Sequence, residues 1–333
     1  MDPALGCGGT ALGNMLYFLL TIALGFGLLV WGSDRLVTGA SALAGNLGVS
    51  PLIIGLTIVG IGTSAPEIMV SGMAAWQGNP HVAIGNAIGS NIANIGLVVG
   101  LTALIIPLVV DSRTLRTEFR LMFAVLLLAG LLLLDGQLTR IDGAILMAGF
   151  GLLVGKMVHA GLTARATDPM GEEFHGEIPA LATLPALFWL LVGLVVVLVG
   201  SRAVVWGAVN VAQALGVSDL VIGLTIIAVG TSLPELGASL MGAYKKEPDI
   251  AIGNVIGSNM FNLLPVLGLP GLIAPGAVPT DVLYRDFPVM LVLSIALVMV
   301  GYGFRKPARI DRWEGAALLA VFCGYQMTLY LSA

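Results

Sequence analysis

The chain has 333 residues, 57% of them hydrophobic and only 10% charged, and its mean hydropathy is +0.99. Soluble domains average about 25% charged residues, so this composition excludes a soluble globular protein and predicts an integral membrane protein. The net charge of −4 carries little information because most charges fall in loops, and we expect no nucleic-acid partner. Cys7 and Cys323 lie near opposite ends, which argues against a disulfide framework and a Cys-x-x-Cys metal site. Residues 1–12 contain no basic segment, so we expect no cleaved signal peptide.

Ten apolar runs are long enough to cross a bilayer, since a spanning helix needs roughly 20 mostly apolar residues. They lie at 13–32, 50–76, 80–107, 118–134, 141–159, 184–206, 218–244, 249–274, 286–303 and 313–332. Small and weakly polar residues continue the first run to about Asn46 and the sixth to about Gln213. A polar linker at 161–183 separates the two halves, so we predict one five-helix repeat at 1–160 and another at 184–333.

The basic residues predict the orientation of these helices. If the helices alternate in direction, most loops that carry Arg or Lys face one side, and only Arg140 and Arg285 face the other. The residues of the basic side are Arg113, Arg116, Arg120, Arg165, Lys245, Lys246, Arg305, Lys306, Arg309 and Arg312. Cytoplasmic loops carry an excess of Lys and Arg. We therefore expect a multi-pass protein of the cell membrane, with a cytoplasmic linker and both termini outside.

The two halves share sequence at a constant offset of 168 residues, without a gap between Ser50 and Leu101. Gly-Thr-Ser-x-Pro-Glu at 62–67 recurs at 230–235, and Ala-Ile-Gly-Asn-x-Ile-Gly-Ser-Asn at 83–91 recurs at 251–259. Five helices is an odd number, so the second copy enters the membrane from the opposite side. Inverted repeats are typical of secondary transporters, whose substrate site lies near the membrane midplane. Symmetric packing of duplicated helices would not by itself explain why the polar residues are retained.

Two acidic residues, Glu67 and Glu235, lie deep within apolar spans at equivalent positions of the repeats. A charge at the bilayer centre costs about 2.5–3.5 kcal/mol on insertion scales, so something must compensate both groups. Either the pair binds a cation or a proton, or two protonated glutamic acids hydrogen-bond the helices together. The first interpretation is favoured.

The residues beside the two glutamates offer oxygen atoms. Pro66 and Pro234 lack a backbone N–H and so release the carbonyl groups four residues earlier. Hydroxyl groups follow on the same turns, from Thr63, Ser64, Thr231 and Ser232. Ca²⁺ takes 6–8 oxygen ligands, whereas the absence of His and Cys from these segments argues against zinc and copper.

The third and eighth helices add a polar stripe. Ser90 and Asn94 are four residues apart and share one helix face, as do their repeat mates Ser258 and Asn262. An ion site is favoured for these four residues over hydrogen bonding between helices. For Asn91 and its repeat mate, which point elsewhere, helix packing is an equally good interpretation.

Asp34 and Arg35 lie late in the first helix, and Arg202 occupies the position equivalent to Asp34 in the sixth. These residues either pair near a membrane surface or extend their charged ends to the interface.

On these motifs the chain resembles the calcium/cation antiporter superfamily, and especially the prokaryotic sodium/calcium exchangers with ten helices. The resemblance covers essentially the whole chain, and its two alpha repeats lie at about 50–101 and 218–269. Proton/calcium exchangers of the superfamily typically have Gly-Asn-x-x-Glu where this chain has Gly-Thr-Ser-x-Pro-Glu, which favours sodium coupling. The resemblance implies that backbone oxygens of Gly60 and Ala228 bind the cation. The side-chain ligands that it implies are Thr63, Ser64, Glu67, Ser90, Asn94, Thr231, Ser232, Glu235, Ser258 and Asn262. Potassium-dependent relatives carry aspartate where this chain has Asn262, which argues against potassium co-transport.

The sequence therefore predicts an all-α membrane antiporter that exchanges Ca²⁺ for Na⁺ by alternating access at a midplane site. The resemblance implies that the first and sixth helices slide against the other eight. Ca²⁺ and Na⁺ are the expected substrates in a lipid bilayer, and we expect no cofactor and no enzymatic activity, because no metalloprotease, nucleophile–base or cofactor motif occurs. A proton/Ca²⁺ antiporter, or one for another divalent cation, with the same fold is the alternative. A cation channel is disfavoured because the predicted site is complete within one chain.

Overall fold

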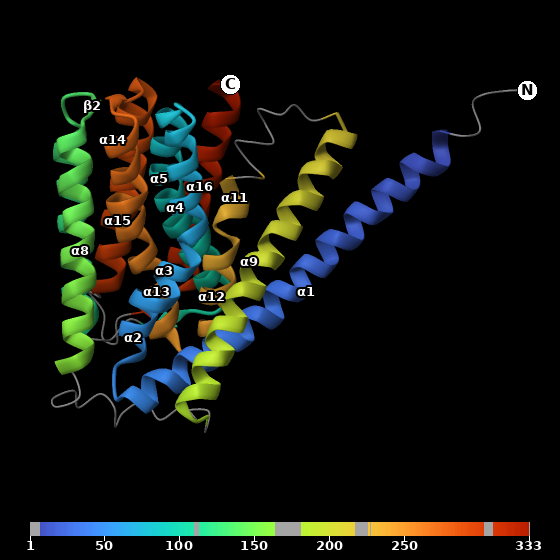
Figure 1. Ribbon diagram of the computed structural model, residues 1–333. Helices are drawn as coiled ribbons and strands as arrows, with labels where there is room; N and C mark the ends of the chain where they lie inside the picture. The colour runs from blue at the N-terminus through green and yellow to red at the C-terminus, as the bar shows by residue number, and fades with distance from the viewer. Residues whose placement is uncertain are drawn as a thin grey trace, which may run out of the picture.

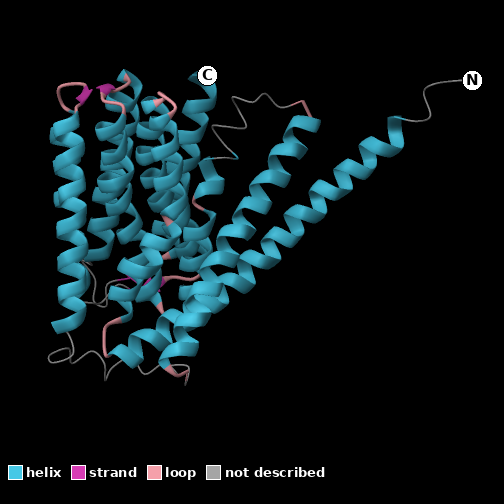
Figure 2. Ribbon diagram, in the orientation of Figure 1, coloured by secondary structure: helices cyan, strands magenta, loops and turns pink. Residues whose placement is uncertain are grey.

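The computed structural model describes residues 7–109, 113–163, 181–216, 226, 228–302 and 309–332. Helices make up nearly all of this part of the chain, and most of them stand side by side in an upright bundle (Figures 1 and 2). The linker predicted at 161–183 and the start of the span predicted at 218–244 lie largely outside the described residues. So do the ends of several loops that carry the basic residues.

The helices of the first half follow the predicted runs. They are α1 (Cys7–Leu47), the broken segment α2 (Pro51–Ile54), η2 (Gly55–Val59), α3 (Gly60–Thr63) and α4 (Ala65–Trp76), the segment α5 (Pro80–Ala93), η3 (Asn94–Val99) and α6 (Gly100–Ile105), then α7 (Arg113–Leu133) and α8 (Arg140–Thr163). The helices written η are π-helical.

The second half repeats this order. It contains α9 (Thr183–Ala214), α11 (Ala228–Thr231), α12 (Leu233–Tyr244), the segment α13 (Pro248–Phe261), η7 (Asn262–Val266) and α14 (Leu267–Ile273), then η8 (Val282–Asp286), α15 (Phe287–Tyr302) and α16 (Arg312–Ser332). Helices α1 and α9 extend to Leu47 and Ala214, in agreement with the small and weakly polar residues beyond the first and sixth apolar runs.

Two short antiparallel ribbons join loops of the two halves. β1 (Leu108–Val109) pairs with β4 (Arg309–Ile310), and β2 (Gln137–Leu138) pairs with β3 (Gly276–Ala277). Each ribbon pairs a loop of the first half with a non-equivalent loop of the second half, since the repeat mate of β1 is β3 and not β4, and the two ribbons tie the halves together at both ends of the bundle (Figure 2).

Length and composition alone mark six described helices as able to cross a membrane, or seven if one bent pair counts as a single span. The bent pair joins 51–63 to 65–76 at an angle of 41°. The helices α7 and α16, each of 21 residues, are not among the six. Part of the shortfall arises from the break at Ser64, and part because the start of the span predicted at 218–244 lies outside the described residues.

Helices α1 and α9 pack against each other and lean away from the bundle (Figure 1). We call them the tilted pair. Glycines repeat every seven residues along both helices, at 25, 32 and 39 and at 193, 200 and 207. A methyl carbon added at Gly193 would lie 2.3 Å from the backbone nitrogen of Leu36, so the two backbones are in direct contact. Small residues at membrane helix interfaces permit such close approach.

Candidate functional site

Breaks in two helices position the glutamates. Helix α3 ends at Thr63 and α4 begins at Ala65, so that Ser64 lies at the break and Glu67 falls in the first turn of α4. The second repeat has the same break at Ser232, between α11 and α12, and Glu235 falls in the first turn of α12. A proline in the first turn of each new helix needs no hydrogen-bond acceptor. Each carboxylate therefore lies at a helix N-terminus, where the helix dipole stabilises negative charge.

Both carboxylates are buried, and the described part of the chain offers neither of them a basic partner. Glu67 and Glu235 are each 1% exposed, and one oxygen of each, Oε2, has no hydrogen-bond partner within the described residues. The two charges lie close enough to repel each other. Among the described residues no Lys or Arg forms an ion pair with either one. A bound cation would compensate both charges.

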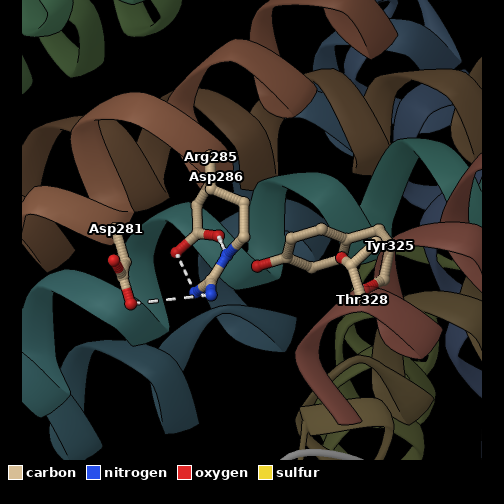
Figure 3. Close-up of polar contacts among 5 residues, drawn as sticks. All are labelled: Asp281, Arg285, Asp286, Tyr325 and Thr328. Carbon is tan, nitrogen blue, oxygen red and sulfur yellow. Dashed lines mark hydrogen bonds and ion pairs between the residues drawn. The ribbon is translucent and has the colours of Figure 1, made fainter. Parts of the chain in front are cut away.

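A third buried carboxylate shows the contrast. Asp286, at the end of η8, lies at the edge of its predicted span, and the structure shows it buried. Its oxygen Oδ1 accepts a hydrogen bond of 2.7 Å from Nε of Arg285, which also approaches Asp281 at 3.6 Å (Figure 3). Its charge is thus neutralised by a neighbouring side chain, which sets it apart from Glu67 and Glu235.

Hydroxyl groups from both repeats converge on Glu235. Ser64 and Ser258 each donate to its Oε1 at 3.5 Å. The hydroxyl oxygens of Thr63 and Ser258 are also 3.5 Å apart, and Thr63 lies 3.4 Å from the carbonyl oxygen of Gly60. These five residues form one connected polar group at the contact between α3 and α13.

Asn94 and Asn262 begin the π-helices η3 and η7 at equivalent positions. Both are 1% exposed, and neither amide group has a hydrogen-bond partner in the described part of the chain. Helix η3 packs on α12, which carries Glu235, and η7 packs on α4, which carries Glu67. Unpaired buried amides are costly, and π-helical turns occur frequently at functional sites. The two asparagines therefore offer two free oxygen atoms to the centre of the bundle.

Asn254 holds the site together, a role that the sequence did not predict. Its Nδ2 donates to the backbone oxygen of Glu235 at 3.2 Å and to Ser239 at 3.1 Å, and its Oδ1 accepts a hydrogen bond of 2.9 Å from Thr63. Asn254 therefore fixes the side chain of Thr63 beside the site. The sequence held one signal for this role, because asparagine recurs at the equivalent positions 86 and 254 of the two repeats. In the structure Asn86 donates to the backbone oxygen of Glu67, as Asn254 does to that of Glu235.

The other predicted ligands have varied surroundings. Ser90 and Ser232 are buried, and the hydroxyl of Ser232 has no partner within the described residues. Thr231 is partly buried at the end of α11, and Ala228 begins that helix. The carbonyl oxygen of Gly60 accepts a hydrogen bond from the backbone nitrogen of Ser64 at 3.0 Å and retains a second lone pair.

The chemistry of the site is that of mixed oxygen donors. Within the described residues no group of three or more His, Cys, Asp or Glu side chains could hold a metal ion. A cation between Glu67 and Glu235 would therefore depend on hydroxyl, amide and carbonyl oxygens for the rest of its shell. Hard cations such as Ca²⁺ accept this donor set.

Comparison with known proteins identifies the family. A family model described as sodium/calcium exchanger protein matches residues 17–157 and 185–331. The chain belongs to the sodium/calcium exchanger family. Membership of this family, within the calcium/cation antiporter superfamily, makes the chain a multi-pass membrane cation antiporter, as the sequence predicted.

Similar exchangers and antiporters match over nearly their full length. The putative antiporter CaxA of Alkalimonas amylolytica is 50% identical over 96% of this chain and 100% of that protein. The sodium/calcium exchanger MaX1 of Methanosarcina acetivorans is 32% identical over 93% of the present chain and 98% of MaX1. A solved structure of the sodium-calcium exchanger NCX_Mj, soaked with 10 mM Na⁺ and zero Ca²⁺, matches with a TM-score of 0.80 and 34% identity, over 95% of this chain and 99% of that one.

Proposed function

We propose that this exchanger moves Ca²⁺ and Na⁺ in opposite directions by alternating access at a site between Glu67 and Glu235. The observation that carries this proposal is the pair of buried carboxylates, each at the start of a helix after a break, for which the described residues provide no basic partner. One Ca²⁺ neutralises both charges, so the occupied site can be exposed to either face. Na⁺ ions that enter the same oxygen cage displace Ca²⁺. The empty site keeps two unpaired charges in a low dielectric, which disfavours the crossing and prevents leak.

The ligand set of the proposal combines the contacts around Glu235 with their repeat mates. It consists of Gly60, Thr63, Ser64, Glu67, Ser90, Asn94, Ala228, Thr231, Ser232, Glu235, Ser258 and Asn262. Backbone oxygens act at Gly60 and Ala228, and side-chain oxygens act at the others. With asparagine at 94 and 262 the site holds two formal negative charges, which suits one Ca²⁺ without potassium.

The proposed architecture is a ten-helix inverted repeat. Its halves are 1–160 and 184–333, joined by a cytoplasmic linker at 161–183, with both termini outside. The repeat offset of 168 residues and the matching order of broken helices support this arrangement. In this scheme the tilted pair slides against the other helices and opens the site to one face at a time.

Sodium coupling is the finer part of the proposal. The names of MaX1 and NCX_Mj state sodium/calcium exchange, whereas the name of CaxA states only an antiporter. The motif Gly-Thr-Ser-x-Pro-Glu in both repeats favours sodium over protons.

Flux measurements in sealed liposomes test the proposal. Uptake of ⁴⁵Ca²⁺ is measured against an outward Na⁺ gradient, with a pH gradient as the control, in wild type, Glu67→Gln and Glu235→Gln. We expect Na⁺-driven uptake in wild type and none in either variant. Uptake driven only by the pH gradient would assign the protein to proton coupling, and no uptake under either gradient would reject Ca²⁺ as the substrate.

A further inference from the structure

One end of α1 is fastened to the turn between α12 and α13 by charged and polar contacts. Nζ of Lys245 lies 2.7 Å from Oδ1 of Asp34 and donates to the hydroxyl of Thr38 at 2.8 Å. One helical turn further along α1, Ser41 donates to Oε1 of Glu247 at 2.6 Å. Three residues on one face of α1 thus hold two residues of the turn.

The tilted pair lies asymmetrically against the bundle. Ser201 of α9 donates to the carbonyl oxygen of Gly230 at 2.9 Å. Its repeat mate on α1, Ser33, makes no equivalent bond among the described residues and lies instead beside Gly237, two turns further along the bundle helix. The two helices therefore contact different levels of the bundle.

The same backbone turn occurs in both repeats with different side chains. The turn residues Gly78 and Lys246 are repeat mates and both have positive φ, of 78° and 62°. The positions equivalent to Lys245 and Glu247 are Gln77 and Asn79, both neutral, and Arg202 stands where α1 has Asp34. Only one of the two turns can therefore form an ion pair with the tilted pair.

From this difference we propose that Asp34, Thr38 and Ser41, with Lys245 and Glu247, form a latch that closes one face of the exchanger. The inference rests on the proposed alternating-access function. The latch stabilises the conformation open to the opposite face, and the uncharged turn at 77–79 provides no counterpart when the exchanger reverses. The positive-inside bias assigns the latched face to the cytoplasm.

The size of the effect follows from the exposure of the pair. The side chains of Lys245 and Asp34 are 28% and 36% exposed, so solvent screens their attraction. Pairs of this kind shift an equilibrium by about two- to fivefold. The apparent affinity of a site varies with the fraction of molecules open to the ligand. Loss of the latch should thus strengthen apparent Ca²⁺ binding from the cytoplasm and weaken it from outside, so that the ratio of the two apparent affinities changes by about two- to fivefold.

Vesicles of defined orientation test this asymmetry. The half-saturating Ca²⁺ concentration is measured in inside-out and right-side-out vesicles for wild type, Asp34→Asn, Lys245→Gln, Ser41→Ala and the charge swap Asp34→Lys with Lys245→Asp. Arg202→Gln is the matched control, because Arg202 is exposed at the equivalent position of α9. We expect opposite shifts at the two faces in the single variants, restoration in the charge swap and no shift in the control. Equal shifts at both faces, or none, would overturn the latch; a swap that fails to fold leaves Ser41→Ala to decide.

A second measurement does not depend on transport. Ala44, buried near the end of α1, is replaced by cysteine after removal of Cys7 and Cys323, and its reaction with a membrane-impermeant maleimide is followed from the cytoplasmic face. Asp34→Asn should accelerate the reaction about two- to fivefold. An unchanged reaction rate would overturn the latch. Absence of Na⁺-driven flux in wild type would reject the proposed function and leave this test of the latch unaffected.

Discussion

Replacement of Gly39 by alanine should destabilise the exchanger by separating the tilted pair. A methyl carbon at this position would lie 2.4 Å from the backbone nitrogen of Leu190 and 2.6 Å from the carbonyl oxygen of Ala186. Neither atom can rotate away, so the helices must move apart. Gly27, on the same helix, has no neighbouring atom within 4 Å and provides the matched control.

The magnitude follows from two opposing effects. Overpacking of a tight contact costs about 1–3 kcal/mol, whereas alanine in place of glycine within a helix gains about 0.5–1 kcal/mol. Gly39→Ala should therefore lose up to about 2.5 kcal/mol, while Gly27→Ala should gain up to about 1 kcal/mol. A methyl carbon at Gly207 would lie 2.6 Å from Cγ1 of Ile22 and 2.9 Å from the carbonyl oxygen of Phe18, a less severe contact than at Gly39, and should give an intermediate loss.

Thermal unfolding of the purified variants in one detergent measures this order. We expect melting temperatures in the order Gly27→Ala, Gly207→Ala, Gly39→Ala from highest to lowest, with several degrees between the extremes. Equal melting temperatures, or a stabilised Gly39 variant, would refute the inference that backbone contact holds the tilted pair together.

Three further predictions concern the site and the latch. Burial raises the pKa of Glu247, and the hydrogen bond from Ser41 partly opposes this shift. A raised folded-state pKa adds stability below the ordinary value of 4.5, and this contribution is lost as the pH rises through the raised pKa. The melting temperature of wild type relative to Glu247→Gln should therefore fall as the pH is raised from 4.5, and a difference independent of pH would contradict this reasoning. Asn254→Ala, which removes three buried hydrogen bonds, should weaken equilibrium ⁴⁵Ca²⁺ binding at least fivefold, since one such bond contributes about 1 kcal/mol; unchanged binding would exclude Asn254 as a support of Thr63 and Glu235. Protons should compete with Ca²⁺ for Glu67 and Glu235, so uptake should decrease between pH 8 and pH 6, and constant uptake would contradict that competition.

Local sequence predicted freed carbonyl groups and polar residues beside the two glutamates, and the structure shows a break in each of these helices. Proline removes a backbone donor wherever it occurs, so Pro66 and Pro234 indicated weak points beside Glu67 and Glu235 without any knowledge of the fold. The constant repeat offset then indicated that the two breaks are related. Helix type and approximate bounds also followed from the apolar runs, because membrane spans must satisfy their own backbone hydrogen bonds.

The features that the sequence did not predict depend on contacts between distant segments. The π-helices that begin at Asn94 and Asn262 form where segments of the two repeats pack against each other. The contact between Thr63 and Asn254 joins residues 191 positions apart, and that between Ser41 and Glu247 joins residues 206 positions apart. Asp34 was expected either to pair near a membrane surface or to extend to the interface. It lies 3.6 Å from its neighbour Arg35 and 2.7 Å from Lys245. Lys245 belongs to the opposite repeat and has a neutral repeat mate, so the repeat itself gave no indication of that pair.

Residues of the ion site are the same in the two repeats, whereas residues of the latch differ between them, and the proposed mechanism explains why. A transported ion meets the same carboxylates, hydroxyls and amides in both conformations, so Glu67, Asn94 and their mates must serve equally from both faces and are identical in the two repeats. In the proposed mechanism, contacts between the tilted pair and the turns form in only one conformation each. Divergence there changes the relative stability of the two conformations without altering the site. An exchanger can therefore retain a symmetric site and still favour one direction of opening, and the charged turn at Lys245 opposite the neutral turn at Gln77 is the arrangement that this reasoning requires.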